Sequence, residues 1–137
     1  MNKNIKESTQ LELISTTICS SSADGSELVA REISDLIRSR NTDGQHTVLG
    51  LATGSTPIGV YRELVRLHKD EGLSFKKVLT FNLDEYQGLE PEHPESYAAF
   101  MDRHLFSLID IPADAAVVPN GKVPREDVFA YCKAYEE

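Results

Sequence analysis

The sequence has little cysteine, no tryptophan and no long hydrophobic run. Its 137 residues include 2 cysteines, Cys19 and Cys132, which lie far apart and have no partner at the spacing of a metal site. We therefore expect free or buried thiols of a reducing compartment, and the small disulfide scaffolds are excluded. With 40% hydrophobic residues, the chain is long enough to form about one domain around a real core.

Segments for the membrane or for export are also missing. The longest apolar runs, such as residues 48–52, are far shorter than the ~18 residues of a membrane span. The polar start of the chain does not resemble a signal peptide. We therefore expect a cytoplasmic protein with no membrane partner.

Basic side chains are outnumbered by acidic ones. There are 14 lysines and arginines against 22 aspartates and glutamates, for a net charge of −8. Sequence-independent binding to nucleic acid or to an anionic membrane depends on clustered lysine and arginine, and the sequence contains no such cluster. Nucleic acid is therefore excluded as a partner, and an anionic small molecule would need a local site.

Strand-like runs alternate with helical spacing along the chain. Runs that are apolar on both faces predict buried parallel strands at 47–52 and 77–82, with a weaker strand at 115–119. Apolar residues at helical spacing predict four helices, which begin near residues 24, 57, 94 and 125. In the first helix, Leu28, Val29, Ile33, Leu36 and Ile37 are expected to form one apolar face. The alternation predicts an α/β fold, in which helices flank a mainly parallel sheet in a Rossmann-like three-layer sandwich.

The two ends of the chain have a different character from the middle. Residues 1–22 are expected to form an N-terminal extension or an edge strand. Residues 23–137 are expected to form the N-terminal part of a larger domain, because the last predicted helix has no C-cap signal and no strand after it. The alternative is a complete protein whose C-terminal helix docks on the sheet.

The loop after the first strong strand carries the groups of an anion site. Gly54 lets the backbone approach a ligand closely, and the hydroxyls of Thr53, Ser55 and Thr56 can donate hydrogen bonds. The helix that follows adds free N–H groups and a partial positive charge. The loop lacks the glycines and lysine of a Walker or dinucleotide motif. The alternative is an ordinary helix start, with Pro57 at the first helical position and Ser55 or Thr56 as its cap.

The loop after the second strong strand carries two adjacent carboxylates. Asp84 and Glu85 can supply a general base whose pKa is raised by burial or by the neighbouring charge. The alternative is a solvated turn whose acidic residues cap a helix. His93 precedes Pro94 at a helix entrance, where a capping or packing role is expected rather than acid–base chemistry. Neighbouring elements offer no metal cluster and no Ser/His/Asp arrangement.

Taken together, these loops and several further motifs follow a specific order. The segments are LGLATGSTP at 49–57, LSF at 73–75, TFNLDEY at 80–86, GL at 88–89, HPESY at 93–97, DIP at 110–112 and YEE at 135–137. In this order and spacing they closely resemble the glucosamine-6-phosphate deaminases, from about residue 47 to 137. The 6-phosphogluconolactonases share the sheet and the phosphate loop but lack the full Asp-Glu-Tyr and His-Pro-Glu-Ser-Tyr pair.

The resemblance implies a specific reaction without metal or organic cofactor. Glucosamine 6-phosphate is isomerised from aldose to ketose and loses ammonia, which gives fructose 6-phosphate. The loop of Thr53, Gly54, Ser55 and Thr56 would hold the sugar phosphate. Asp84 would act as the catalytic base that takes the proton from C2 and returns it to C1, and Glu85 would help set its pKa.

The sequence also departs from the pattern of these deaminases. Their ring-opening histidine and acidic residues lie on a segment with an Asp-Gly-His motif, and a basic residue that grips the phosphate also lies in the later half. Neither is present here, so the resemblance implies the N-terminal half of a deaminase, inactive alone. The alternatives are a non-catalytic sugar-phosphate-binding or regulatory relative, or another sugar-phosphate isomerase or lactonase. A homo-oligomer is compatible with the resemblance, because members of the family are often oligomeric.

Overall fold

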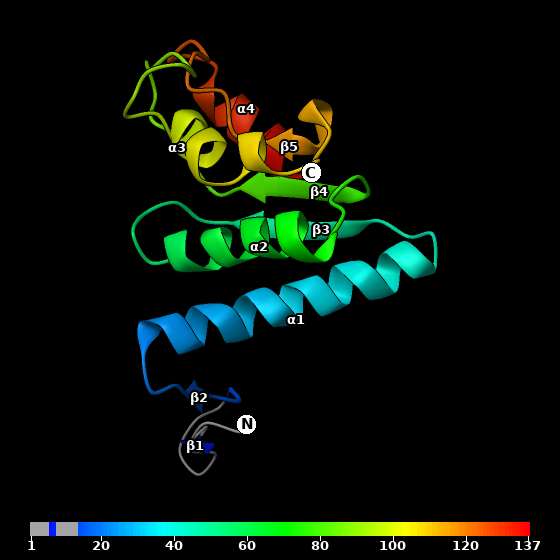
Figure 1. The fold of residues 1–137 in the computed structure, drawn as a ribbon. Coiled ribbons are helices and arrows are strands. Elements are labelled where there is room, and N and C mark those ends of the chain that lie inside the picture. Colours follow the sequence, from blue (N-terminus) through cyan, green and yellow to red (C-terminus); the bar gives the residue numbers. More distant parts are fainter. Residues whose placement is uncertain (1–5, 8–13) are drawn as a thin grey trace.

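The computed structural model describes residues 6–7 and 14–137, and its centre is a parallel sheet in the order β3-β4-β5. The strands are β3 (Thr47–Leu51), β4 (Val78–Asn82) and β5 (Ala116–Val117). All neighbouring pairs are parallel, and β3 and β4 pair over their full length (Figure 1). The α/β fold with a parallel sheet predicted from the sequence is confirmed, with all three strands within the predicted ranges.

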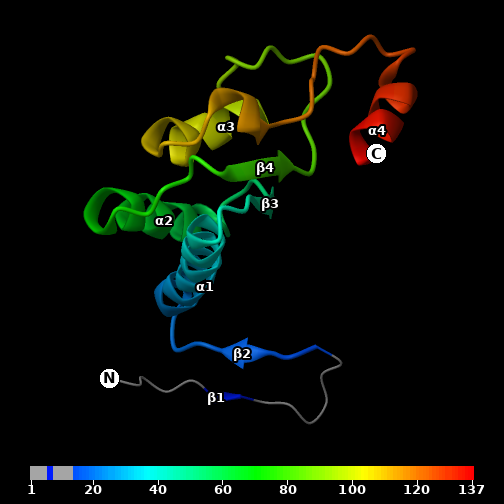
Figure 2. The ribbon, with the colours of Figure 1, turned by 90° about the vertical axis from the view of Figure 1, so that its right-hand side faces the viewer.

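Helices cover the sheet unequally. The helices are α1 (Ser22–Thr42), α2 (Ile58–Glu71), α3 (Tyr97–His104) and α4 (Val128–Glu136), with 3-10 turns η1 (Phe106–Leu108) and η2 (Ala113–Ala115). Figures 1 and 2 show α1, α2 and α3 on one side of the sheet and α4 on the other. The three layers of the predicted sandwich are therefore present, with a small second helical layer.

A short strand pair lies apart from this sheet. Strand β1 (Lys6–Glu7) pairs antiparallel with β2 (Thr17–Ile18), on the far side of α1 from the sheet (Figure 2). The predicted edge strand is thus present at residues 17–18, but it pairs with β1 instead of the main sheet. The remainder of residues 1–13 lies outside the described part.

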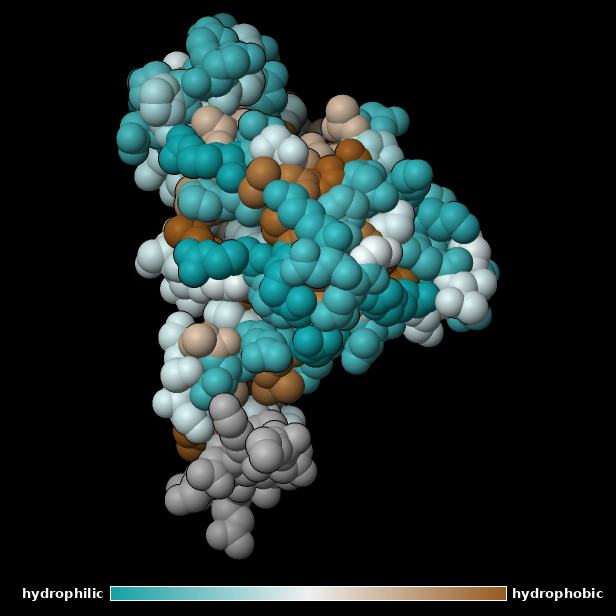
Figure 3. Space-filling view, viewed as in Figure 1, coloured by the Kyte–Doolittle hydropathy of each residue, from teal (hydrophilic) through white to brown (hydrophobic). Residues whose placement is uncertain are grey.

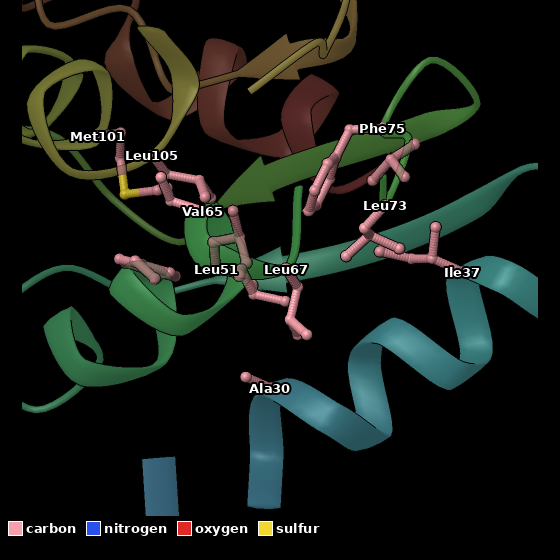
Figure 4. Close-up of a cluster of buried hydrophobic side chains, with 12 residues drawn as sticks. Ala30, Ile37, Leu51, Val65, Leu67, Leu73, Phe75, Met101 and Leu105 are labelled. Carbon is pink, nitrogen blue, oxygen red and sulfur yellow. The ribbon is translucent and has the colours of Figure 1, made fainter. Parts of the chain in front are cut away.

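The core fills the space between the sheet and its larger helical layer. Figure 4 shows side chains of α1, α2 and α3 gathered beside the strands of the sheet. The buried apolar residues are Ala30, Ile37, Leu51, Tyr61, Leu64, Val65, Leu67, Leu73, Phe75, Val78, Met101 and Leu105. Helix α1 contributes Ala30, Ser34 and Ile37 to the buried set. Val29 and Leu36 are 43% and 44% exposed, so the predicted apolar face was wrong at these two positions. They lie to the sides of the narrow stripe that meets α2.

The opposite face of the sheet is only partly covered. Val48 is 64% exposed and Phe81 is 38% exposed, while Thr47 and Asn82, whose side chains point to the other face, are buried. Helix α4 reaches this face through Tyr135, whose ring packs edge-on against Phe81 with centroids 6.3 Å apart.

The surface over α1 and α2 is mostly hydrophilic. Figure 3 shows this face in teal, with apolar atoms gathered higher, around α3 and β5. Cys19 is half-buried and Cys132 is exposed, and both are free, as predicted from their separation. Within the described residues, we find no helix with the length and apolarity required to cross a membrane.

Two predicted helix starts were too early. Helix α3 begins at Tyr97 instead of near Pro94, because the Ser96 hydroxyl accepts a hydrogen bond from Ala99 N at 3.0 Å and so caps the helix there. Residues 124–127 form a turn before α4, which begins at Val128 instead of near Arg125. Both segments contain proline, which favours turns ahead of a helix.

Replacing Tyr61 by Phe tests the tie between α2 and the end of β3. Tyr61 is 3% exposed, and its hydroxyl donates to the Ala52 carbonyl oxygen at 2.5 Å. We expect Tyr61→Phe to lower the free energy of unfolding by about 1–2 kcal/mol, because the carbonyl loses its partner. Urea unfolding measures this loss. The control is Tyr131→Phe, which removes an exposed hydrogen bond to Asn120 N and should cost less. An equal loss in both variants would contradict the assignment.

The same tyrosine should make the fold sensitive to alkali. Burial raises the pKa of Tyr61 above its ordinary value. Because the pKa is higher in the folded state, the neutral phenol stabilises the fold fully below pH ~10, and this contribution is lost as the pH rises through the folded pKa. We expect wild-type stability to fall more steeply above pH ~10 than that of Tyr61→Phe. Parallel stability curves would refute this expectation.

Candidate functional site

The two loops singled out in the sequence begin side by side. In the parallel pair of β3 and β4, Leu51 lies opposite Asn82. Thr53 and Asp84 each follow two residues later, so both leave the sheet at the same carboxyl edge. In open α/β sheets this edge is where ligands bind.

The first loop leads into a helix whose N-terminus is open. Gly54 has a φ of +97°, a left-handed conformation that favours glycine, so it turns the chain toward α2. Pro57 immediately precedes the helix, no side chain caps it, and its first turn contains no acidic residue. By contrast, Ser21 caps α1 and Ser96 caps α3.

The sequence prediction for this helix start was therefore wrong in detail. Pro57 is the residue before the first helical one, and neither Ser55 nor Thr56 supplies a capping hydrogen bond. Thr56 and Pro57 form a turn instead. The side chains of Ser55 and Thr56 are both exposed. The free N–H groups of the first turn of α2, together with these hydroxyls, form the kind of site that binds an anion.

Two buried side chains hold the end of β3 in place. Tyr61 from α2 donates to the carbonyl oxygen of Ala52, and Asn82 Nδ2 from β4 donates to that of Leu51 at 3.4 Å. The loop that follows is thus anchored to both the helix and the neighbouring strand.

Asp84 presents a free carboxylate at this edge. The residue is exposed, and no hydrogen bond or ion pair to its carboxylate forms among residues 14–137. A cavity of about 190 Å³ lies beside it on the α4 side, lined partly by Gln87, Asn120, Tyr131 and Tyr135. The carboxylate is therefore available to a ligand.

Glu85 is used differently from its neighbour. Its Oε1 accepts hydrogen bonds from Tyr86 N at 2.8 Å and from Tyr97 N at 2.9 Å, and its Oε2 accepts one from Ala98 N at 2.9 Å. Glu85 therefore caps the N-terminus of α3. Of the two readings of the Asp-Glu pair, the helix cap applies to Glu85, while Asp84 remains the candidate base.

Tyr97 packs against the Asp84 loop, and the sequence pattern did not mark it as a site residue. Its hydroxyl lies 3.2 Å from that of Tyr86, and the ring centroids are 4.7 Å apart. The Tyr86 hydroxyl raises the pKa of Tyr97, burial and the Asp84 charge add to the rise, and the nearby Thr53 hydroxyl opposes it. Tyr97 belongs to the HPESY motif, which pointed to a role in the site. Helical spacing instead assigned Tyr97 to an apolar face.

His93 and His68 make structural contacts. His93 Nδ1 accepts a hydrogen bond from Glu95 N at 3.2 Å, in keeping with the capping role expected for it.

The structure also brings His68, Ser74 and Asp110 together, although the sequence suggested no such arrangement. Ser74 donates to Asp110 at 2.9 Å, and His68 Nδ1 lies 3.6 Å from the same carboxylate. Asp110 lies between the other two, so this is no nucleophile–base pair.

Comparison with known proteins now decides the family. The family model described as glucosamine-6-phosphate isomerases/6-phosphogluconolactonase matches residues 20–137. The chain belongs to this family. The match includes both loops and all of the main sheet.

Individual members of the glucosamine-6-phosphate isomerase/6-phosphogluconolactonase family resemble the chain to different degrees. A glucosamine-6-phosphate deaminase of Geobacillus sp. (strain WCH70) is 46% identical over 111 residues, which are 81% of this chain and 43% of the relative. Glucosamine-6-phosphate deaminase 2 of Giardia intestinalis is 54% identical over 73% of this chain and 36% of the relative. The chain therefore spans less than half the length of these curated relatives.

Solved structures of the family share the fold. A monomeric glucosamine-6-phosphate deaminase superposes with a TM-score of 0.78 and 42% identity, over 86% of this chain and 46% of that one. The 6-phosphogluconolactonase of Leishmania guyanensis gives a TM-score of 0.63 at 24% identity, over 87% of this chain and 47% of that one. The lactonase match supports the fold alone.

A methyl group at Gly121 should disturb the Asp84 loop. Gly121 is buried, its carbonyl oxygen accepts from Gly88 N at 2.6 Å, and an added Cβ would overlap the carbonyl oxygen of Tyr86. We expect Gly121→Ala to cost about 1–3 kcal/mol in unfolding free energy, as overpacking does. Gly50→Ala is the matched control, because an added Cβ there meets nothing within 4 Å. Equal stability of the two variants would contradict the close packing of the loop.

Proposed function

We propose that the chain provides the phosphate site and the proton-transfer base of a glucosamine-6-phosphate deaminase. The observation that carries the proposal is the open N-terminus of α2 beside the free carboxylate of Asp84. The deaminase relatives at 46% and 54% identity support this activity over that of a lactonase. We expect the protein to act in the cytoplasm on a small sugar phosphate, and its free cysteines suit a reducing compartment.

The phosphate would bind at the loop of Thr53, Gly54, Ser55 and Thr56. Backbone N–H groups at the start of α2 and the exposed hydroxyls of the loop supply donors, and the helix dipole favours negative charge there. No acidic side chain in the first turn of α2 opposes an anion. The overall charge of −8 therefore does not prevent phosphate binding.

With the phosphate anchored, the other end of an open-chain sugar would reach Asp84. As general base, Asp84 would take the proton from C2 while O1 takes a proton from the substrate's own ammonium group, leaving an enolamine in which C1 and C2 are doubly bonded. The same carboxyl group would then return its proton to C1, and water would replace the nitrogen at C2, which leaves as ammonia. Anchoring the phosphate lowers the barrier by holding C2 against the base.

Ligand binding by the chain tests the phosphate site. We expect glucosamine 6-phosphate to shift the backbone amide NMR signals of Gly54, Ser55 and Ile58, because these N–H groups lie at the proposed site. Glucosamine without phosphate is the control and should leave these signals in place. Shifts confined to other regions, or no binding at millimolar ligand, would contradict the proposed function.

Asp84→Asn tests the proposed base in a chimaera that joins this chain to the remaining half of the Geobacillus deaminase. Asparagine keeps the shape of the side chain but cannot accept the proton, so ammonia release should fall by about 10²–10⁴-fold. The dissociation constant for glucosamine 6-phosphate should change little. Glu92→Gln, at an exposed position in the following loop, is the matched control. Unchanged turnover in Asp84→Asn would refute Asp84 as the base.

The chain alone should not release ammonia, because the ring-opening residues expected from the resemblance are not among its residues. An ammonia assay with the isolated chain, alongside the active chimaera as its positive control, measures this directly. Measurable turnover by the isolated chain would overturn our view that a second half is required.

A further inference from the structure

The adjacent carboxylates of Asp84 and Glu85 differ in their contacts with the rest of the protein. Glu85 engages both of its oxygens with backbone N–H groups, whereas among residues 14–137 no group binds the carboxylate of Asp84. We infer that Glu85 is a positioning residue, whose bonds to α3 hold the Asp84 carboxylate at a fixed place opposite the Thr53–Thr56 loop. The inference rests on the proposed function for the identity of the ligand.

The hydrogen bonds from α3 to Glu85 are strong, because a charged carboxylate accepts them at the N-terminus of a helix. Hydrogen bonds from backbone N–H groups to a carboxylate are charge-assisted, and the N-terminus of a helix carries a partial positive charge. Glu85 binds the N–H groups of Tyr97 and Ala98, and Ser96 binds that of Ala99. The first three donors of α3 are therefore all occupied, so this helix start binds the loop and offers no site for an anion.

The loop is held on its other side by close packing. Gly88 N donates to the carbonyl oxygen of Gly121 at 2.6 Å, and Cγ of Glu85 lies only 3.2 Å from where a Cβ at Gly121 would stand. The backbone of residues 85–88 thus runs between α3 and the turn at 120–121. Since Asp84 directly precedes this fixed segment, its carboxylate has little freedom to move relative to the sheet.

The same bonds also place Tyr97. Its backbone N–H is bound to Glu85, while its hydroxyl lies 3.2 Å from that of Tyr86. Residues 85–86 and the start of α3 are therefore joined through both backbone and side-chain contacts. Without the Glu85 carboxylate, the Asp84 end of the ligand site would lose its connection to α3, while the Thr53–Thr56 loop would keep its own anchors.

Binding of two ligands of different length distinguishes a positioning role of Glu85 from a general effect on the stability of the fold. Inorganic phosphate needs only the Thr53–Thr56 loop, whereas glucosamine 6-phosphate also reaches the Asp84 end. In the 137-residue chain, we expect Glu85→Gln to leave the dissociation constant of inorganic phosphate within about twofold. That of glucosamine 6-phosphate should rise roughly tenfold, the scale of one charged hydrogen bond. Amide hydrogen exchange at Tyr97 and Ala98 should accelerate more than at Ala99, which keeps its Ser96 cap.

Two further variants complete the design. Glu85→Asp keeps the charge but shortens the side chain, so it should behave like Glu85→Gln if reach is what matters. Glu92→Gln removes an exposed charge nearby and should change none of these measurements. If Glu85→Gln does not fold by its melting curve, Glu85→Asp carries the test.

The remaining results contradict the inference. Equal weakening of both ligands would show a general structural role, as would failure of both variants to fold. Weaker sugar-phosphate binding with unchanged exchange at Tyr97 and Ala98 would show direct contact of Glu85 with the ligand. Unchanged affinity for both ligands would show no role. Failure of the wild-type chain to bind either ligand would instead contradict the proposed function.

Discussion

The parallel pairing of β3 with β4 is the constraint on which the rest of the site depends. Because Leu51 lies opposite Asn82, the two strands end together, and their loops emerge at one edge of the sheet. A shift of this register would separate Thr53 from Asp84 and move Asn82 away from the carbonyl of Leu51. The buried core between sheet and helices holds the register, since Leu51 and Val78 both belong to it.

The helices differ in how their N-termini are capped. Side chains cap α1 and α3, and the cap of α3 includes Glu85. The N-termini of α2 and α4 have no side-chain cap, and that of α2 follows a loop rich in hydroxyls at the carboxyl edge of the sheet. In an acidic protein, the proposed anion site therefore depends on local N–H groups and hydroxyls, next to the carboxylate that would act on the ligand.

The periodicity of apolar residues predicted the fold well, but the sequence could not show which residue of the site has which role. Strands 47–51 and 78–82 were evident because their residues are apolar on both faces. Asp84 and Glu85 look alike in the sequence, and what distinguishes them is N–H groups of α3 that lie 12 and 13 positions beyond Glu85. Tyr97 was missed for a related reason, because helical spacing shows which side a residue takes but not that its hydroxyl reaches another loop.

The most direct test of the account is a crystal structure of the chain with glucosamine 6-phosphate. We predict that the phosphate contacts the N–H groups at the start of α2 and the hydroxyls of the Thr53–Thr56 loop, with C2 of the sugar next to the Asp84 carboxylate. A phosphate bound away from the N-terminus of α2, or a sugar directed away from Asp84, would contradict the account.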